Sequence, residues 1–288
     1  MTDVRGRSRT RVGGVVAGLI NYVGPMSERP RFHAQDHGRD NILYDPQVMP
    51  IQDARGLAEA PSLAREGVAL VAHDTAVKNF RDPDEVARVY LAEVEALVRA
   101  ATGAGQAVVL PGGGFVRYAE RSPWFGSGMN TQPARFPHID FTRKTAPGIG
   151  DASRFGAEHA AALRPGQRLV GYNVWRVISE PPQDVPLAIC DARSIGMEDL
   201  VVADGVYDDG DPSTWWTSEA YLLAHNRRHR WLYFSEMRPD EALIFRAYDN
   251  APHERPATAH SAFDDPACPP EAPGRVSVEA RAFAIFDD

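Results

Sequence analysis

The sequence predicts a mainly β protein with flanking helices around a jelly-roll core. From residue 136 onward, short runs of β-branched and aromatic residues alternate with turns rich in Pro and Gly, a pattern typical of β-sandwiches and jelly rolls. The part before residue 136 contains one clear amphipathic helix, so we expect helices beside the sheets. The strands predicted in the second part are 169–178, 187–192, 199–203, 230–234, 242–248 and 276–286.

The N-terminal part is expected to contain fewer regular elements. Residues 13–25 predict a strand that ends at Gly24 and Pro25, and residues 67–73 predict a second, short strand. Residues 27–62 are rich in Pro, Asp and Arg, which predicts an irregular segment that wraps the surface or covers a site.

The clearest helix begins at Asp82. An Asp at the N-cap, Pro83 in the first turn and acidic residues near the positive end of the helix dipole are typical start signals. Apolar residues then recur at spacings of three and four, and Gly103 is well placed to end the helix. We expect this helix to pack against the core and to carry no chemistry.

Residues 106–110 predict a further strand, which residues 111–114 interrupt. Three consecutive Gly could bind phosphate, but no Lys followed by Ser or Thr and no helix start comes after them, so we expect a flexible turn. A second helix is expected at 153–163, outside the sheets.

The sequence contains no internal repeat and no linker, so we expect a single domain over residues 13–288. Within it, residues 13–135 should buttress a double-stranded β-helix, the cupin-like jelly roll, formed by residues 136–288. Residues 1–12 carry four Arg and predict a mobile basic arm. The apolar run after this arm is too short for a signal peptide and lacks a small-residue cleavage site.

Composition limits the possible functions and partners. The chain has 288 residues, of which 43% are hydrophobic and 24% charged, as in soluble globular proteins. A net charge of −8 argues against affinity for nucleic acid, and no apolar run is long enough to span a membrane. Only Cys190 and Cys268 are present, so we expect no disulfide framework and a cytoplasmic location. A small-molecule substrate is therefore expected.

His138 and Asp140 are separated by one residue on a predicted strand, so their side chains point to the same face. An imidazole and a carboxylate supply two ligands of an octahedral metal site, and a distant His would complete the 2-His-1-carboxylate triad of non-haem Fe(II) oxygenases. His260 is the candidate third ligand. His138, Asp140 and His260 are thus the predicted metal-binding and catalytic residues.

A candidate carboxylate receptor follows His260. Arg275 and Ser277 lie two residues apart at the start of the last predicted strand, so a guanidinium and a hydroxyl share one face. Arg281 lies on the same face and competes for this role, but Arg275 is favoured because Ser277 accompanies it. A His-x-Asp pair, a distant His and then Arg-x-Ser is the order found in 2-oxoglutarate-dependent oxygenases.

Tyr172, Trp175 and Arg176 are candidate substrate contacts. Trp175 and Arg176 should point to opposite faces of their strand, so only one of them can face into the barrel. A Trp in this position is more often part of a core, and a buried Arg needs an anionic partner.

Other aromatic and His residues have two interpretations each. Trp215 and Trp216 lie in a polar segment and could form a lid over the substrate or simply cover the surface. With Tyr172, Trp175, Trp231 and Tyr233 they are expected near the barrel mouth, where a partly apolar molecule would bind. Three further His lack a carboxylate at strand spacing and are expected on the surface; these are His225, His229 and His253.

Several longer segments resemble one family. They are INY (20–22), GYNVWR (171–176), PLAICDARS (186–194), HRWLYF (229–234), DEALIF (240–245) and HSAFDDP (260–266). In these segments the chain is similar to the family of the cephamycin C-7 hydroxylase component, the asnovolin endoperoxide-forming oxygenase and gibberellin-desaturase-like enzymes. The resemblance covers nearly the whole chain after residue 18.

The resemblance implies a double-stranded β-helix that uses Fe(II), 2-oxoglutarate and O2. It further implies that 2-oxoglutarate chelates the iron and pairs through its far carboxylate with Arg275 and Ser277, and that a ferryl species then attacks a substrate C–H bond while succinate and CO2 are released. Hydroxylation, desaturation or oxidative cyclisation of a small specialised metabolite is the expected outcome. One departure lies at 111–115, where a His-Thr segment is expected before Arg117, so no substrate role is carried over for that loop.

Two other classes of function stay open at this point. A cupin-type metal enzyme, such as an isomerase or a dioxygenase that does not use 2-oxoglutarate, would share the metal site but would not need Arg275. A non-catalytic jelly roll that binds a small molecule would tolerate loss of His138 or His260. Metal content separates the last class from the enzymes, and dependence on the keto acid separates the two enzymes.

Overall fold

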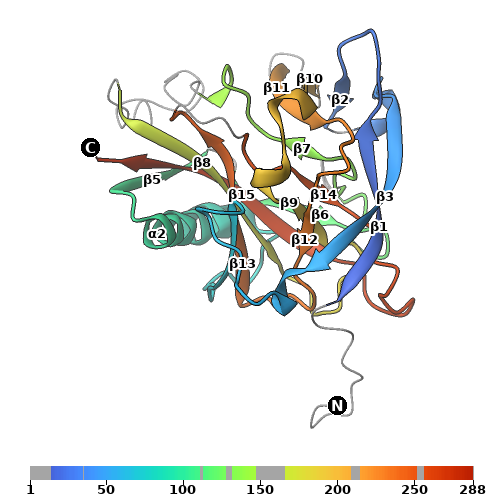
Figure 1. Ribbon diagram of the computed structural model, residues 1–288. Helices are drawn as coiled ribbons and strands as arrows, with labels where there is room; N and C mark the ends of the chain where they lie inside the picture. Colours follow the sequence, from blue (N-terminus) through green and yellow to red (C-terminus); the bar gives the residue numbers. More distant parts are fainter. Residues whose placement is uncertain are drawn as a thin grey trace.

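The computed structural model describes residues 14–34, 36–110, 113–127, 132–146, 166–208, 215–251 and 256–287. Within these residues two β-sheets pack face to face, and a helix covers the outer face of the smaller sheet (Figure 1). The arm predicted at 1–12 and the helix predicted at 153–163 lie outside the described residues. The predicted fold class, mainly β with a jelly-roll core, is confirmed.

The larger sheet has nine strands in the described part of the chain. Its order from edge to edge is β1 (Val15–Val23), β3 (Tyr44–Asp53), β12 (Trp231–Tyr233), β9 (Leu187–Cys190), β14 (His260–Ala262), β7 (His138–Ile139), β11 (Trp216–Leu223), β10 (Leu200–Tyr207) and β2 (Arg31–His33). The two shortest central strands, β14 and β7, are antiparallel neighbours, and His260 lies directly opposite His138.

The smaller sheet has the order β4 (Val68–Ala72), β13 (Glu241–Asp249), β8 (Arg168–Val177), β15 (Val276–Phe286) and β5 (Gln106–Val109). Strand β6 (Phe115–Tyr118) also pairs with β15, beyond the end of β5. The six strands predicted after residue 136 are all present, shifted by a few residues at their ends. Their β-branched and aromatic content favours extended backbone, which is why local sequence finds them.

The predicted helix is confirmed and consists of α1 (Pro83–Glu85), a π-helical turn (Val86–Tyr90) and α2 (Leu91–Thr102). Asp82 caps its first amides, and Gly103 ends it with a left-handed φ of 72°. Short 3-10 turns occur at His37–Arg39, Ala54–Gly56, Ala192–Ser194 and Met197–Asp199. In the described residues no helix is long and apolar enough to cross a membrane.

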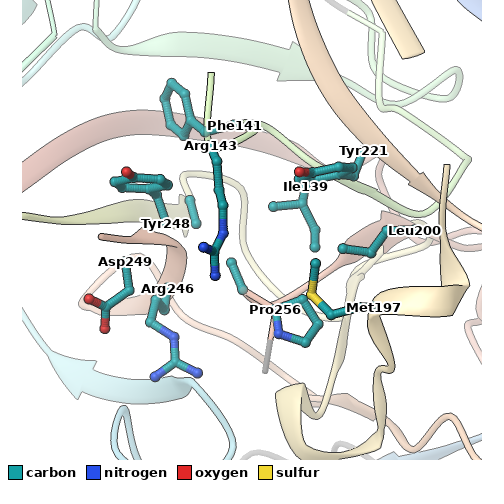
Figure 2. Close-up of a pocket in the computed structure, with 12 residues that line it drawn as sticks. Ile139, Phe141, Arg143, Met197, Leu200, Tyr221, Arg246, Tyr248, Asp249 and Pro256 are labelled. Carbon is teal, nitrogen blue, oxygen red and sulfur yellow. The ribbon is translucent and has the colours of Figure 1, made fainter. Parts of the chain in front are cut away.

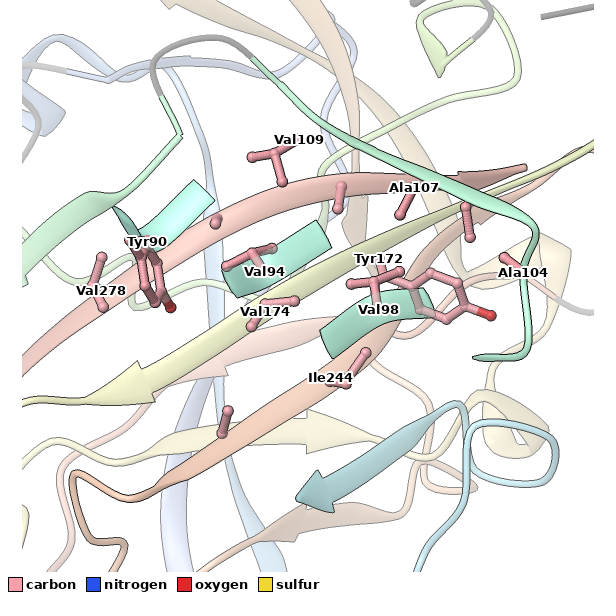
Figure 3. Packing of buried hydrophobic residues seen from close by; sticks show 14 of the residues in the cluster. Tyr90, Val94, Val98, Ala104, Ala107, Val109, Tyr172, Val174, Ile244 and Val278 are labelled. Atoms are coloured by element: carbon pink, nitrogen blue, oxygen red, sulfur yellow. The ribbon is translucent and has the colours of Figure 1, made fainter. Parts of the chain in front are cut away.

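In β8 and β15, even-numbered and odd-numbered residues point to opposite faces of the sheet, so only one of the two sets can face the other sheet. Figure 3 shows Val94 and Val98 of α2 packed against Val174, with Val278 beside Tyr90. Even-numbered residues of both strands therefore face the helix. Odd-numbered residues face the larger sheet, because successive strand side chains point to opposite faces. Trp175 and Val177 accordingly pack with residues of the larger sheet.

The prediction that residues 27–62 are irregular is wrong. This segment contains β2 and the ten-residue β3, which pairs with β1 at every residue except the last, Asp53. Its Pro46 and Pro50 suggested a loop because Pro cannot donate to a ladder. They are tolerated because β12 pairs only with 51–53, so the rest of β3 has β1 as its one strand partner in the described residues.

Candidate metal centre

Three side chains meet between the two sheets. His138 and His260 come from neighbouring strands of the larger sheet, and Asp140 follows β7. One ligand atom from each residue lies within 4.8 Å of the other two. The Nε2 atoms of His138 and His260 lie 4.0 and 3.9 Å from the Asp140 carboxylate oxygens. This spacing allows all three residues to bind one ion with little movement.

The protonation of this cluster suits a metal ion. The Nδ1 of His138 lies 3.0 Å from the Phe136 carbonyl, and donating a proton there leaves Nε2 free to bind a metal. Burial and the neighbouring His138 lower the pKa of His260 to about 3, so its imidazole is neutral. Burial alone would raise the pKa of Asp140, but Arg281 and the two His outweigh it, and the pKa is lowered. Asp140 and His260 are thus in the deprotonated forms that metal binding requires.

The Asp140 carboxylate is held from the smaller sheet. Asn173 donates from Nδ2 to Oδ2 at 2.5 Å, and Arg281 donates from Nη2 to Oδ1 at 2.7 Å. Sequence reasoning missed Asn173. Asn173 lies two residues before Trp175 on the same strand, so the two side chains share one face, and this spacing could have indicated that Asn173 points inward. Arg281, expected as a rival receptor for a carboxylate, contacts Asp140 and also lies 3.2 Å from Glu279.

Arg275 lies just before β15 and is 2% exposed, and its Nε and Nη1 have no hydrogen-bond partner among the described residues. Its guanidinium lies over the Trp175 ring, 5.5 Å from the centroid, and burial lowers its pKa to about 9. The hydroxyl of Ser277 is also buried, and the part of the chain that the structure describes gives it no hydrogen-bond partner. A buried cation that lacks an anion is costly to the fold, so this cavity is suited to an anion from solution.

Two cavities adjoin the cluster. The first is lined by Trp175, Arg275, Glu279 and His260. The second is lined by Asp140 and by three aromatic residues, Phe32, Phe136 and Tyr207. His138, Arg117 and Arg281 line both. A molecule in either cavity therefore lies beside the metal ligands.

Two of the candidate substrate contacts lie elsewhere. Tyr172 and Arg176 have even numbers and face the helix, on the opposite side of the sheet from the cluster. Arg176 is fully buried and donates to the ring of His73 and, at 2.8 Å, to its carbonyl. This placement corrects the expectation that both contact substrate. Trp175 faces the site, where it lies beneath Arg275.

The expected surface position of His229 is wrong. Its side chain is fully buried, stacks on Tyr22 and makes hydrogen bonds to Asp199 and to the Tyr22 hydroxyl. These contacts satisfy both ring nitrogens inside the core of the larger sheet. His225 is half-buried and meets the Tyr22 ring edge to face, while His253 lies outside the described residues.

The aromatic residues expected at the barrel mouth divide into two groups. Trp231 and Tyr233 are buried in the core of the larger sheet, so they do not line the mouth. Trp216 is not in a loop but begins β11, and its ring stacks on Tyr207 with centroids 3.9 Å apart. Because Tyr207 lines the second cavity, Trp216 supports a wall of that cavity from outside.

A further cavity lies on the opposite face of β7. Figure 2 shows the Arg143 side chain reaching into it among Ile139, Tyr248 and Pro256. Ile139 lies between His138 and Asp140 in the chain and points away from both, so this cavity does not adjoin the cluster.

Two His and one carboxylate that converge between the sheets of a jelly roll form a candidate facial-triad metal site, an arrangement found in non-haem Fe(II) oxygenases. Comparisons with known proteins identify the family. The family model described as "Oxidoreductase/YMDC permease-like domain" matches residues 20–285. The chain is 31% identical over 251 residues to the Fe(II)/2-oxoglutarate-dependent dioxygenase nvfI of Aspergillus novofumigatus, covering 85% of each protein. It is 30% identical to the hydroxylase/desaturase efuI of Hormonema carpetanum, over 87% of this chain and 88% of that protein.

A solved structure of the iron and α-ketoglutarate-dependent endoperoxidase NvfI matches with a TM-score of 0.79 and 26% identity, over 97% of this chain and 100% of that one. The chain belongs to this family of Fe(II)/2-oxoglutarate-dependent oxygenases. It is a 2-oxoglutarate-dependent dioxygenase that uses Fe(II), 2-oxoglutarate and O2. The expected family and cofactors are confirmed, and the two alternative classes are set aside.

Proposed function

We propose that His138, Asp140 and His260 hold the iron and that Arg275, with Ser277, binds the far carboxylate of 2-oxoglutarate. The observation that carries this assignment is the buried Arg275 guanidinium. Its Nε and Nη1 have no hydrogen-bond partner in the described parts of the chain, and it lines a cavity that His138 and His260 also line. The donor set of two imidazoles and one carboxylate fits Fe(II) and leaves positions open for other ligands.

The residues of the chain would then orient and shield the reactants. Bound iron and 2-oxoglutarate supply the oxidising chemistry, so the protein contributes position, dryness and electrostatics. Asn173 and Arg281 hold the Asp140 carboxylate from two sides. Trp175 supports Arg275 from below, and Tyr207 with Phe136 closes the second cavity, where the primary substrate would lie.

Adding 2-oxoglutarate to the anaerobic Fe(II) protein is expected to produce a visible charge-transfer absorption, because the keto acid would chelate the metal. Absorbance titration measures this. Pyruvate, which lacks the far carboxylate, is the matched control and should need a much higher concentration. If iron binds and neither keto acid produces the band, the assignment of this cavity fails.

The proposed reaction is hydroxylation, desaturation or oxidative cyclisation of a free small specialised metabolite. The second cavity supports this because its aromatic walls and few polar groups suit a small, partly apolar molecule. Small-molecule pools are expected to stimulate succinate formation by the iron-loaded enzyme, measured by mass spectrometry. Stimulation by a peptide, a protein or a nucleic acid, and by no small molecule, would contradict the proposal.

We also infer that residues 13–288 act as one domain in the cytoplasm. Strands from 13–135 and from 136–288 contribute to both sheets, which supports a single folding unit. Cys190 and Cys268 are both free, as suits a reducing compartment.

A further inference from the structure

A third arginine, Arg117, faces the site and takes part neither in the proposed iron binding nor in the proposed 2-oxoglutarate binding. Arg117 lies on β6 directly opposite Ser277 of β15, so the two side chains share the inward face of the smaller sheet. Arg117 lines the cavity of Arg275 and also the second cavity, beside Asp140 and Tyr207. A ligand bound to Arg117 would therefore lie next to the metal ligands.

The Arg117 guanidinium has no partner in the described part of the chain. Its buried Nη1 makes no hydrogen bond, and burial lowers its pKa although Glu279 partly offsets this. The two carboxylates that line the cavities with Arg117, Asp140 and Glu279, are both paired with Arg281. A buried cation is costly without an anion, so a position of this kind indicates a ligand site.

The charged residues that line the two cavities indicate the charge of the ligand that binds there. The two cavities are lined by three arginines, Arg117, Arg275 and Arg281, and by two carboxylates, Asp140 and Glu279. The formal charges of these five side chains, three positive and two negative, sum to one positive charge, and the charges of Fe(II) and 2-oxoglutarate cancel. One positive charge therefore remains for the primary substrate to neutralise.

The surroundings of Arg117 point to the second cavity. Arg117 lines that cavity together with Arg281, Tyr207 and Asp140. Arg117 and Arg281 both lie near the Phe115 ring, at 5.8 and 5.4 Å from its centroid. Resting on the proposed function of the site, we propose that the primary substrate carries a carboxylate, that Arg117 binds it, and that the apolar part of the substrate lies against Phe32, Phe136 and Tyr207.

Calorimetric titration of the anaerobic protein, loaded with Fe(II) and saturating 2-oxoglutarate, tests this with known probes. The probes are the phenylalkanoates from phenylacetate to 5-phenylpentanoate and their methyl esters. At least one acid should bind about tenfold or more tightly than its ester, since a charge-assisted contact to a guanidinium is lost in the ester. If no acid binds more tightly than its ester, the proposal is overturned.

Three variants locate the contact. Arg117→Gln should lose the preference for acid over ester, and Arg117→Lys should retain part of it because the charge remains. Arg228→Gln, which changes an exposed arginine paired with Glu198, should behave as the wild type does. An unchanged preference in Arg117→Gln would overturn the proposal. Denaturant midpoints of the apo variants should not fall, since Arg117→Gln removes an unpaired buried charge.

The charge-transfer titration separates this proposal from the assignment of 2-oxoglutarate. Arg117→Gln should need the same 2-oxoglutarate concentration as the wild type. If it needs about tenfold more, Arg117 belongs to the co-substrate site and the substrate proposal is wrong. If the band is absent in the wild type as well, the assignment of the co-substrate cavity is what fails.

Discussion

His260→Ala is expected to abolish tight iron binding and to lower turnover by at least about 100-fold. Loss of a residue that only supports a metal ligand already costs about 10- to 100-fold in affinity or activity, and this change would remove a ligand itself. His138 and Asp140 would then be the two remaining protein ligands among the clustered residues. Iron stoichiometry after anaerobic desalting, followed by succinate formation, measures both effects.

His229→Ala is the matched control for His260→Ala. His229 is also a buried His in the larger sheet, with Asp199 and Tyr22 as its partners, so its loss should lower stability. The surviving folded protein should still bind one iron. Wild-type activity in His260→Ala would show that another residue supplies the third ligand, and full loss of iron in folded His229→Ala would make His229 the first to test.

Arg275→Gln is expected to raise the 2-oxoglutarate concentration needed for half-maximal turnover by about 10- to 100-fold. The change removes a charge-assisted, two-point contact to a carboxylate, while the iron requirement should hardly change. Keto-acid and iron titrations of the same preparation measure the two requirements separately.

Arg281→Gln on the same strand face is the matched comparison for Arg275→Gln. Arg281 holds Asp140 at 2.7 Å, so its loss should weaken iron binding more than 2-oxoglutarate binding. If Arg281→Gln instead raises only the 2-oxoglutarate requirement and Arg275→Gln does not, the two arginines have been assigned the wrong way round.

Local patterns predicted much of the fold and part of the candidate site. The helix was found from Asp82 to Gly103 because caps and apolar spacing act within a few residues. β3 was missed because its two Pro suggest a loop, and only its pairing with β1 shows that a strand can tolerate them. The sequence predicts a surface position for His229 because its neighbours in the chain are polar. Its actual partners, Tyr22 and Asp199, are distant in the chain, so no local pattern shows them.

The order of residues along a strand is enough to predict which side chains share a strand face, because backbone geometry alternates them with a period of two. That rule was sufficient to group His138 with Asp140 and Arg275 with Ser277. Which face of each strand meets the other sheet follows from the packing of the two sheets. This packing brings Asn173 and Arg281 to Asp140 and turns Tyr172 and Arg176 toward the helix, and among the described residues it leaves the buried Nη1 of Arg117 without a hydrogen bond beside the site. The physical reason is that sheet packing depends on contacts between residues far apart in the chain, which no local pattern encodes.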